Sequence, residues 1–230
     1  MQSESPPKSE KDLGRQTPAD QSRKAPKKRR EQQRAVDTRL AILKAALPEF
    51  AEKGFDGAST RNIGDRANLH HPLITYHFRT KDALWRAVAE HAFTEIGGLW
   101  DQEVPDDSTL TPKDRVREEF RIFLRFTIQH PDFHLFMLRE NVAGSPRLPW
   151  LVDTFLRPII SRVLPQIKSA QEVGEMPEGD PVLVYYMLIG MVSALSSLGA
   201  EMRKTSGVQP DDPAVVDAYW ALIEKTMFRN

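Results

Sequence analysis

Residues 60–84 read TRNIGDRANLHHPLITYHFRTKDAL, and this stretch decides the fold of the front of the chain. Ser59 and Thr60 are both residues that cap helix starts, and the pattern after them predicts a short helix over residues 61–67. Asn68 tolerates a positive φ angle, so it suits the left-handed position that ends a helix. A short helix followed by a tight turn is therefore predicted here.

Helices are predicted on both sides of that turn. A second short helix covers residues 71–78, and Pro72 lies in its first turn, where a missing N–H does no harm. Thr80 caps a further helix, predicted over residues 81–100. Before the quoted stretch, apolar residues recur at helical spacing over residues 39–54. The front of the chain is thus predicted to hold a scaffold helix and two short helices.

Two short helices joined by a tight turn form a helix-turn-helix, whose second helix fits the major groove of DNA. Ile74 and Phe78 are the pair expected to face the core, which leaves a polar face of histidines, threonine and tyrosine. The alternative is a unit that only packs, but such side chains gain little on a helix without a partner. The DNA-binding candidates are Ser59, Thr60, Arg61, His70, His71, Leu73, Thr75, Tyr76, His77 and Lys81.

With the leading segment AILKAALPEFAEKGF, the quoted stretch resembles the DNA-binding region of the TetR family of bacterial transcriptional regulators, over about residues 37–90. The resemblance implies a homodimer whose recognition helices lie in the major grooves of a palindromic operator. It implies that the last two long helices of each subunit pair as a four-helix bundle. It also implies a repressor that releases the operator when a small molecule binds the carboxy-terminal body.

The resemblance also assigns residues. Those on positions that contact DNA in the family are Thr60, Arg61, His71, Thr75, Tyr76, His77 and Lys81. The family usually has glycine where Asn68 stands, which the φ argument makes acceptable. It usually has tyrosine directly after the core aliphatic of the recognition helix, where this chain has Thr75. The tyrosine contact is therefore either missing or shifted by one residue.

Charge is segregated along the chain. Basic and acidic residues each number 32, but residues 1–36 carry a balance of +5 and residues 91–230 a balance of −6. A basic front suits an anionic partner for the front only. Residues 1–33 are poor in side chains that pack, which predicts a disordered basic tail. Two roles stay open for this tail, a solubilising segment and an arm that contacts DNA.

The rest of the chain is predicted to be helical, because capping-type residues stand before prolines and no alternating strand pattern occurs. Helix starts are predicted at Thr111-Pro112, His130-Pro131, Ser145-Pro146, Asp180-Pro181 and Asp212-Pro213. They give helices near residues 112–129, 131–143, 147–171, 181–203 and 213–228. The fold class is all-α with about nine helices. The predicted domains are the tail (1–33), the DNA-binding domain (34–90) and the ligand-binding and dimerisation domain (91–230).

The body is rich in aromatic and sulfur-containing side chains, most of which core packing explains. A ligand pocket needs such a lining and a few polar groups. The candidate ligand-binding residues are Trp100, Phe123, Thr127, Phe136, Met137, Glu140 and Tyr186. The ligand itself is not specified by the sequence, and no cofactor is expected.

His130 and His134 stand four residues apart, a spacing that suits a metal pair. This makes an all-α metal-binding or enzymatic protein the alternative function. No HExxH motif, third ligand or cysteine supports it, and the motifs of serine hydrolases, dinucleotide-binding and P-loop proteins are missing. We therefore predict no metal site and no enzymatic activity.

Residues 182–200 form an uncharged stretch of nearly bilayer-spanning length. Its serines and glycines favour a buried helix of a soluble core over a membrane span. The first 36 residues lack the apolar segment of a signal peptide. We expect a cytoplasmic protein with no membrane partner.

Overall fold

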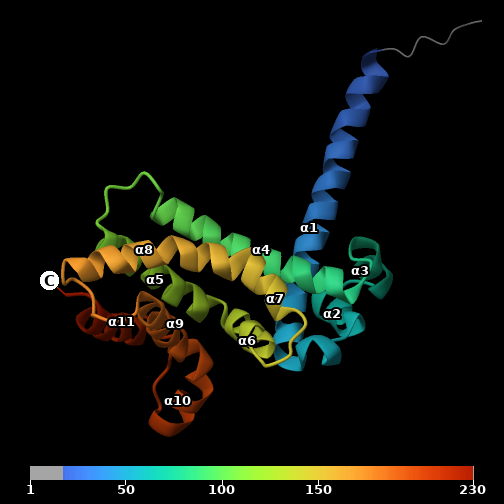
Figure 1. Ribbon diagram of the computed structural model, residues 1–230. Coiled ribbons are helices and arrows are strands. Elements are labelled where there is room, and N and C mark those ends of the chain that lie inside the picture. The colour runs from blue at the N-terminus through green and yellow to red at the C-terminus, as the bar shows by residue number, and fades with distance from the viewer. Residues whose placement is uncertain (1–17, 230) are drawn as a thin grey trace, which may run out of the picture. The chain divides into compact units, whose positions relative to one another are not determined.

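A computed structural model describes residues 18–229, with side chains from residue 29 onward (Figure 1). Regular structure in this range is entirely helical, which confirms the predicted all-α class. Its elements are α1 (Pro18–Gly57), α2 (Thr60–Ala67), α3 (His71–His77), α4 (Lys81–Glu103), α5 (Pro112–Gln129), α6 (Pro131–Glu140), α7 (Leu148–Leu151), η1 (Val152–Leu156, a π-helix), α8 (Arg157–Glu172), α9 (Pro181–Ser197), α10 (Gly199–Ser206) and α11 (Pro213–Met227). By its contacts the chain divides into two units, residues 1–41 and residues 42–230.

The first unit differs from the predicted tail. Residues 18–33 were expected to be disordered, but they form the first turns of α1; residues 1–17 lie outside the described residues. Lys, Arg, Glu, Gln and Ala fill positions 27–35, and all of them have high helix propensity. The side chains of residues 29–37 are exposed, and Gln33 Nε2 donates to Asp37 Oδ1 at 2.8 Å. Helix propensity, which needs no burial, accounts for the difference.

The predicted helix-turn-helix is present, with the expected local chemistry. Ser59 is the cap of α2, because its Oγ accepts the Arg61 N–H at 3.2 Å. Asn68 ends α2 with φ at 54°. A Cβ on Gly64 would stand 3.0 Å from the carbonyl oxygen of Leu69. The tight approach of the turn to α2 therefore depends on a glycine at position 64.

Most predicted helix starts in the rest of the chain are confirmed by side-chain caps. Such caps occur at Thr80, Thr111, Asp180 and Asp212. The start predicted at Ser145-Pro146 is wrong, since α7 begins at Leu148. Ser145 Oγ accepts the Arg147 N–H at 3.3 Å, just before that start, and donates to a Glu140 carboxylate oxygen at 2.6 Å.

Two predicted helices are broken in the structure. Residues 147–171 form α7, η1 and α8 in succession. The ring of Pro158 clashes with the carbonyl four residues earlier in a regular helix, which favours the wider π-helical turn before it. The helix predicted over residues 181–203 bends by 62° between α9 and α10. A Cβ on Gly199 would lie 3.1 Å from Pro210 Cγ, so the bend brings the following loop close to α10.

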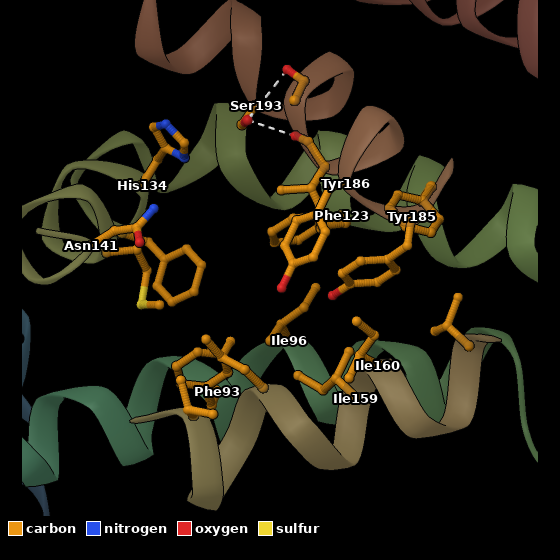
Figure 2. A pocket seen from close by; sticks show the side chains of 18 of the residues that line it. Phe93, Ile96, Phe123, His134, Asn141, Ile159, Ile160, Tyr185, Tyr186 and Ser193 are labelled. Atoms are coloured by element: carbon orange, nitrogen blue, oxygen red, sulfur yellow. Dashed lines mark hydrogen bonds between the residues drawn. The ribbon is translucent and has the colours of Figure 1, made fainter. Parts of the chain in front are cut away.

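In the body, α5 packs against both α8 and α9, and α8 also packs against α9. Figure 1 shows α2 and α3 beside the first turns of α4. It shows α4 and α8 along one side of α5, and α9 and α11 along the other. The helices α4, α5, α6, α8 and α9 together enclose the cavity drawn in Figure 2.

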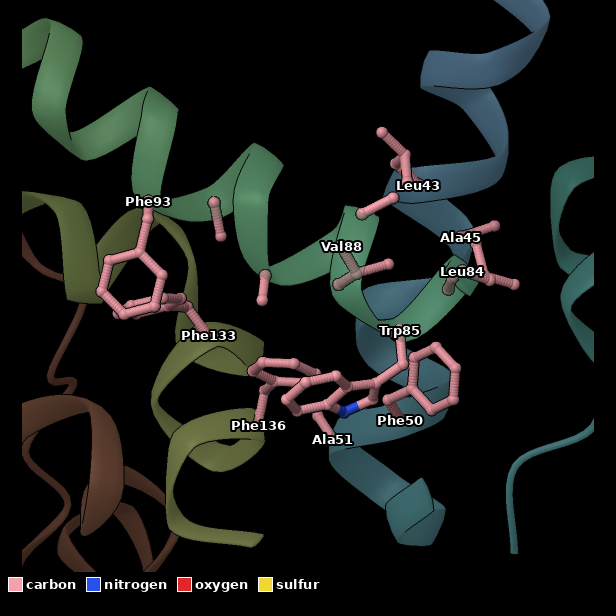
Figure 3. Close-up of a cluster of buried hydrophobic side chains, with 14 of the residues drawn as sticks. Leu43, Ala45, Phe50, Ala51, Leu84, Trp85, Val88, Phe93, Phe133 and Phe136 are labelled. Atoms are coloured by element: carbon pink, nitrogen blue, oxygen red, sulfur yellow. The ribbon is translucent and has the colours of Figure 1, made fainter. Parts of the chain in front are cut away.

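The core cluster of the helix-turn-helix extends into the body. Phe50 and Ala51 of α1 pack in one buried cluster with Trp85 of α4 and Phe136 of α6 (Figure 3). The rings of Trp85 and Phe136 stack with centroids 5.2 Å apart. The buried side chains are thus continuous across the domain boundary predicted at residue 90, which itself stays a prediction.

The uncharged stretch at residues 182–200 forms α9 and the bend after it. Val184, Leu188 and Val192 are buried in a second core cluster, as the buried-helix interpretation predicts. By contrast, Leu183 and Met187 on the same helix are exposed. No single helix within residues 18–229 has the length and apolarity of a membrane span; α9 and α10 meet that criterion only when joined across their bend.

Candidate DNA-binding surface and ligand cavity

The predicted recognition helix, α3, has one buried and one exposed face. Ile74 and Phe78 are buried, as the sequence predicts for the core pair. His70, His71 and Thr75 are exposed, and Tyr76 is 79% exposed. Leu73 and His77 are half-buried, and the Tyr76 ring meets the His77 ring edge-on at 5.3 Å. The structure therefore gathers the α3 candidates on a surface that a DNA groove can contact.

The remaining candidates lie at the starts of α2 and α4. Thr60 Oγ1 and His71 Nε2 are hydrogen-bonded at 3.0 Å, which ties the first turn of α2 to that of α3. The Arg61 side chain is exposed. Lys81 Nζ donates to the carbonyls of Asp56 and Ala58, each at 3.1 Å. Lys81 therefore holds the turn before α2, a role that the sequence did not indicate.

A buried carboxylate on α1 sets the position of α2. Glu49 is 1% exposed, and its Oε1 accepts from the Ser59 N–H at 3.3 Å and from Asn62 Nδ2 at 3.1 Å. Its Oε2 pairs with Arg66 Nε at 3.1 Å. Three points along α2 are thus fastened to one side chain, which fixes the angle between the scaffold helix and the helix-turn-helix.

The body encloses a cavity of about 730 Å³, within the range of pockets that hold drug-sized ligands. Its wall includes Val152 and Leu156 of the π-helical segment, a type of distortion that often marks functional sites. The apolar part of the wall comes mainly from α4, α5, α6, α8 and α9. It includes Phe93, Ile96, Trp100, Phe120, Phe123, Phe133, Met137, Ile159, Ile160, Val163 and Ile189.

Four of the predicted ligand-binding residues line this cavity: Trp100, Phe123, Met137 and Tyr186. The other three, Thr127, Phe136 and Glu140, do not. Thr127 is buried, and its hydroxyl donates to the carbonyls of Leu124 and Val192.

On α6, the other two residues, Phe136 and Glu140, lie on the face opposite the cavity. Phe136 stacks on Trp85, and Glu140 pairs with Arg147 Nε at 3.1 Å. His134 and Met137 take the cavity side instead. Because the apolar run over residues 135–138 covers more than one face of α6, its sequence did not indicate which face meets the cavity.

Several polar groups of the cavity wall were not among the predicted ligand-binding residues. They are Glu119, His134, Asn141, Tyr185 and Ser193. Figure 2 shows the rings of Tyr185 and Tyr186 extending from α9 into the cavity, with His134 and Asn141 side by side on another part of the wall. Glu119 lies in the middle of an amphipathic helix, and a carboxylate there is usually solvent-exposed, so no sequence signal marked it.

Burial decides the protonation of these groups. Burial raises the pKa of Tyr185 to about 12, with smaller contributions from Tyr186 and Glu119, so its hydroxyl keeps its proton. Burial lowers the pKa of His134, which makes its imidazole neutral at pH 7. Burial also raises the pKa of Glu119, and the charges of Arg162 and Arg115 oppose that rise.

Helix α6 connects the cavity to the DNA-binding part. From the side away from the cavity, Arg139 donates to the carbonyls of Ala51 at 3.1 Å and Glu52 at 2.8 Å, near the end of α1. Gly54 has φ at 69° and interrupts α1 there, which leaves carbonyls in need of donors. The guanidinium of Arg147 lies 4.0 Å from the ring centre of Phe55. A shift of α6 would therefore act directly on α1.

The alternative metal pair is not assembled into a site. The His130 ring packs on Phe126, with centroids 4.5 Å apart, while His134 lines the cavity. Within residues 18–229, no three His, Asp or Glu side chains gather in a way that could hold a metal ion. No observation in the described part of the chain favours the metal or enzyme alternative.

Comparison with known proteins identifies the region that holds the candidate DNA-binding surface. Residues 42–88, which hold the end of α1, α2, α3 and the start of α4, match the sequence model of the bacterial regulatory proteins of the tetR family. Residues 42–88 thus carry the DNA-binding region of the TetR family. The resemblance on which the DNA-binding residues were predicted is thereby confirmed, while their individual contacts stay predictions.

The relatives that this chain matches are regulators by name. The HTH-type transcriptional repressor Rv3405c of Mycobacterium tuberculosis is 40% identical over 90 residues, which cover 39% of this chain and 45% of that protein. The chain thus matches less than half the length of the first curated relatives.

Solved structures share the fold along most of the chain. The regulator SCO4942 of Streptomyces coelicolor has a TM-score of 0.63 and 24% identity, covering 84% of this chain and 99% of that one. AibR, solved with isovaleryl coenzyme A and operator DNA, has a TM-score of 0.64 and 16% identity, covering 82% of this chain and 97% of that one. At these identities the likeness shows the fold alone.

Proposed function

We propose that this TetR-family chain is a transcriptional repressor that binds a palindromic operator and is released when a small molecule fills the cavity of the body. The observation that carries the proposal is the exposed face of α3, held by the buried Ile74 and Phe78. The AibR complex, which contains an acyl coenzyme A and operator DNA, supports the pairing of these two activities on one fold. A cytoplasmic location accompanies the proposal.

The direct test is selection of bound duplexes from a random DNA pool at moderate salt, followed by sequencing. We expect a palindromic consensus with half-site centres about 34–36 Å apart, or a multiple of that distance. We also expect affinity to fall steeply with salt, because each neutralised phosphate contributes a slope of roughly −0.9 in log K against log salt. A folded, dimeric sample that enriches no sequence would refute the proposal.

Substitution of Arg61 by alanine is expected to weaken binding to the selected operator roughly tenfold and to relax the preference at one base pair. Arg61 is exposed beside α3, and one good bidentate base contact discriminates by about 1–3 kcal/mol.

Lys81→Ala should instead weaken binding to all sequences alike, since Lys81 holds the turn at Asp56 and Ala58. Repeating the selection with each variant separates the two effects, and exposed Lys44→Ala on α1 serves as the control. An unchanged consensus for Arg61→Ala would place base recognition elsewhere.

The proposed repressor is a homodimer formed through α9 and α11. These helices are joined by the Tyr219 hydroxyl, which donates to the Met191 carbonyl at 2.8 Å. Leu183 and Leu222 are both 64% exposed in the single chain, and Met187 is also exposed. Large apolar side chains clustered on neighbouring helices are typical of an interface.

The dimer is tested by placing a charge in this surface. Leu183→Glu is expected to raise the dimer dissociation constant at least tenfold, because the interface would then bury an unpaired carboxylate. Sedimentation velocity over a concentration series measures the change. Leu110→Glu, at an exposed leucine outside α9 and α11, is the matched control and should sediment like the unmodified chain. Equal dissociation constants for both variants would exclude this surface as the interface.

A further inference from the structure

The cavity wall contains a carboxylate whose hydrogen-bonding capacity is not used. Glu119 is 3% exposed, and its Oε1 has no hydrogen bond within the described part of the chain. The nearest cationic atoms are Arg162 Nη2 at 3.5 Å and Arg115 Nη1 at 4.0 Å, both ion-pair distances. A buried acceptor without a donor is costly, so Glu119 stands ready to accept from a molecule that enters the cavity.

The charges around Glu119 restrict what that molecule can be. Arg115 also meets Asp106 at 3.9 Å, so two carboxylates face two guanidinium groups, and an ammonium group would find no free counter-charge beside Glu119. A carboxylate ligand would instead meet the negative charge of Glu119. Burying either ion among aromatic side chains costs several kcal/mol unless it is paired. The balance at Glu119 therefore favours an uncharged ligand.

The other polar groups of the wall are uncharged or already paired. The hydroxyls of Tyr185 and Tyr186 extend into the cavity (Figure 2), that of Tyr185 keeps its proton, and the His134 imidazole is neutral. Arg157, which also lines the cavity, pairs with Asp153 at 3.0 Å and is largely exposed. The cavity thus offers hydrogen bonds to a neutral polar group and an apolar, aromatic surface to the rest of the ligand.

We propose that the cavity binds a neutral, largely apolar molecule carrying a hydroxyl group, which donates its hydrogen bond to Glu119 Oε1. This inference rests on the ligand-responsive function proposed above and specifies the ligand class. The cavity of about 730 Å³ accommodates a ligand of two or more fused rings or an equivalent hydrocarbon. The aromatic wall supplies apolar contact, and Glu119 supplies the preference for an alcohol or a phenol.

Four matched probes test the proposal: 2-(2-naphthyl)ethanol, its methyl ether, 2-(2-naphthyl)ethylamine and 2-naphthylacetate. They share one ring system and differ in a neutral donor, no donor, a cation and an anion. Binding to the full chain without DNA is measured by calorimetry. We expect the alcohol to bind at least tenfold tighter than each of the other three, since a site built for a hydroxyl rejects analogues that lack it.

Glu119→Gln tests the role of the carboxylate itself. An amide oxygen accepts a weaker hydrogen bond than a carboxylate, so the preference for the alcohol over the ether is expected to fall to about threefold. Glu172→Gln, at an exposed glutamate of α8, is the matched control and should keep the full preference.

The unmodified chain decides the question even where the Glu119 variant does not fold. Binding of the ether, the amine or the acetate as tightly as the alcohol would overturn the proposal, and so would no binding of any probe. Because no DNA is present, these outcomes leave the repressor function to the operator selection. Operator binding with no preference for the alcohol refutes only the ligand class.

Discussion

Glu49→Ala is expected to lower the free energy of unfolding by about 3 kcal/mol, more than any other single substitution considered above. The substitution leaves the Ser59 N–H, the Asn62 amide and the Arg66 guanidinium without their buried acceptor. Removing one partner of a buried ion pair typically costs about 3–5 kcal/mol, and partial exposure of Arg66 places the value at the lower end. Urea denaturation followed by circular dichroism measures the change at constant m-value.

The control is Glu52→Ala, because Glu52 pairs with the same arginine, Arg66. Glu52 pairs with Arg66 Nη2 at 2.7 Å, but both side chains are more than a third exposed. Pairs of this kind contribute about 0–1 kcal/mol, so Glu52→Ala should cost less than 1 kcal/mol. Equal losses for the two variants would show that Glu49 acts as a surface charge and not as a buried hub. Operator affinity should fall only in the Glu49 variant, because only Glu49 fixes α2 against α1.

Local signals explain which parts of this fold were predictable. The caps at Ser59 and Thr80 and the left-handed Asn68 depend on one or two neighbouring residues, and the sequence displays those neighbours directly. The bend at Gly199 depends on packing between separated segments, because the loop at Pro210 lies against the start of α10. The helix predicted over residues 147–171 contains Pro158, whose ring disfavours the regular turn before it, and the structure divides this range into α7, η1 and α8.

The cavity shows the same limit for the site. Aromatic composition predicted a pocket in the body, and Trp100 and Tyr186 do line it. Glu140 was expected there for its position after an apolar run, but it turns to Arg147. Glu119, in a helix whose charges otherwise suit solvent, points inward because α8 and α9 cover it. Whether a charged residue is buried depends on which helices pack over it. A single sequence does not show that packing.

Arg139→Gln is expected to separate ligand binding from operator release. Arg139 of α6 donates to the carbonyls of Ala51 and Glu52 of α1, while the opposite side of α6 forms part of the cavity wall. Coupling between two sites typically amounts to about 1–3 kcal/mol, or roughly 5- to 150-fold in affinity. In the unmodified chain, saturating naphthylethanol should weaken operator binding within that range.

For Arg139→Gln we expect saturating naphthylethanol to weaken operator binding by less than about threefold. The affinity for naphthylethanol in the absence of DNA should be unchanged. Fluorescence anisotropy of a labelled operator, with and without the alcohol, gives the factor. Exposed Arg121→Gln on α5 is the matched control, since α5 also lines the cavity. Release of the Arg139 variant by the full wild-type factor would contradict the route through α6. Coupling is reciprocal, so a genuine loss must also appear as an operator that no longer weakens alcohol binding.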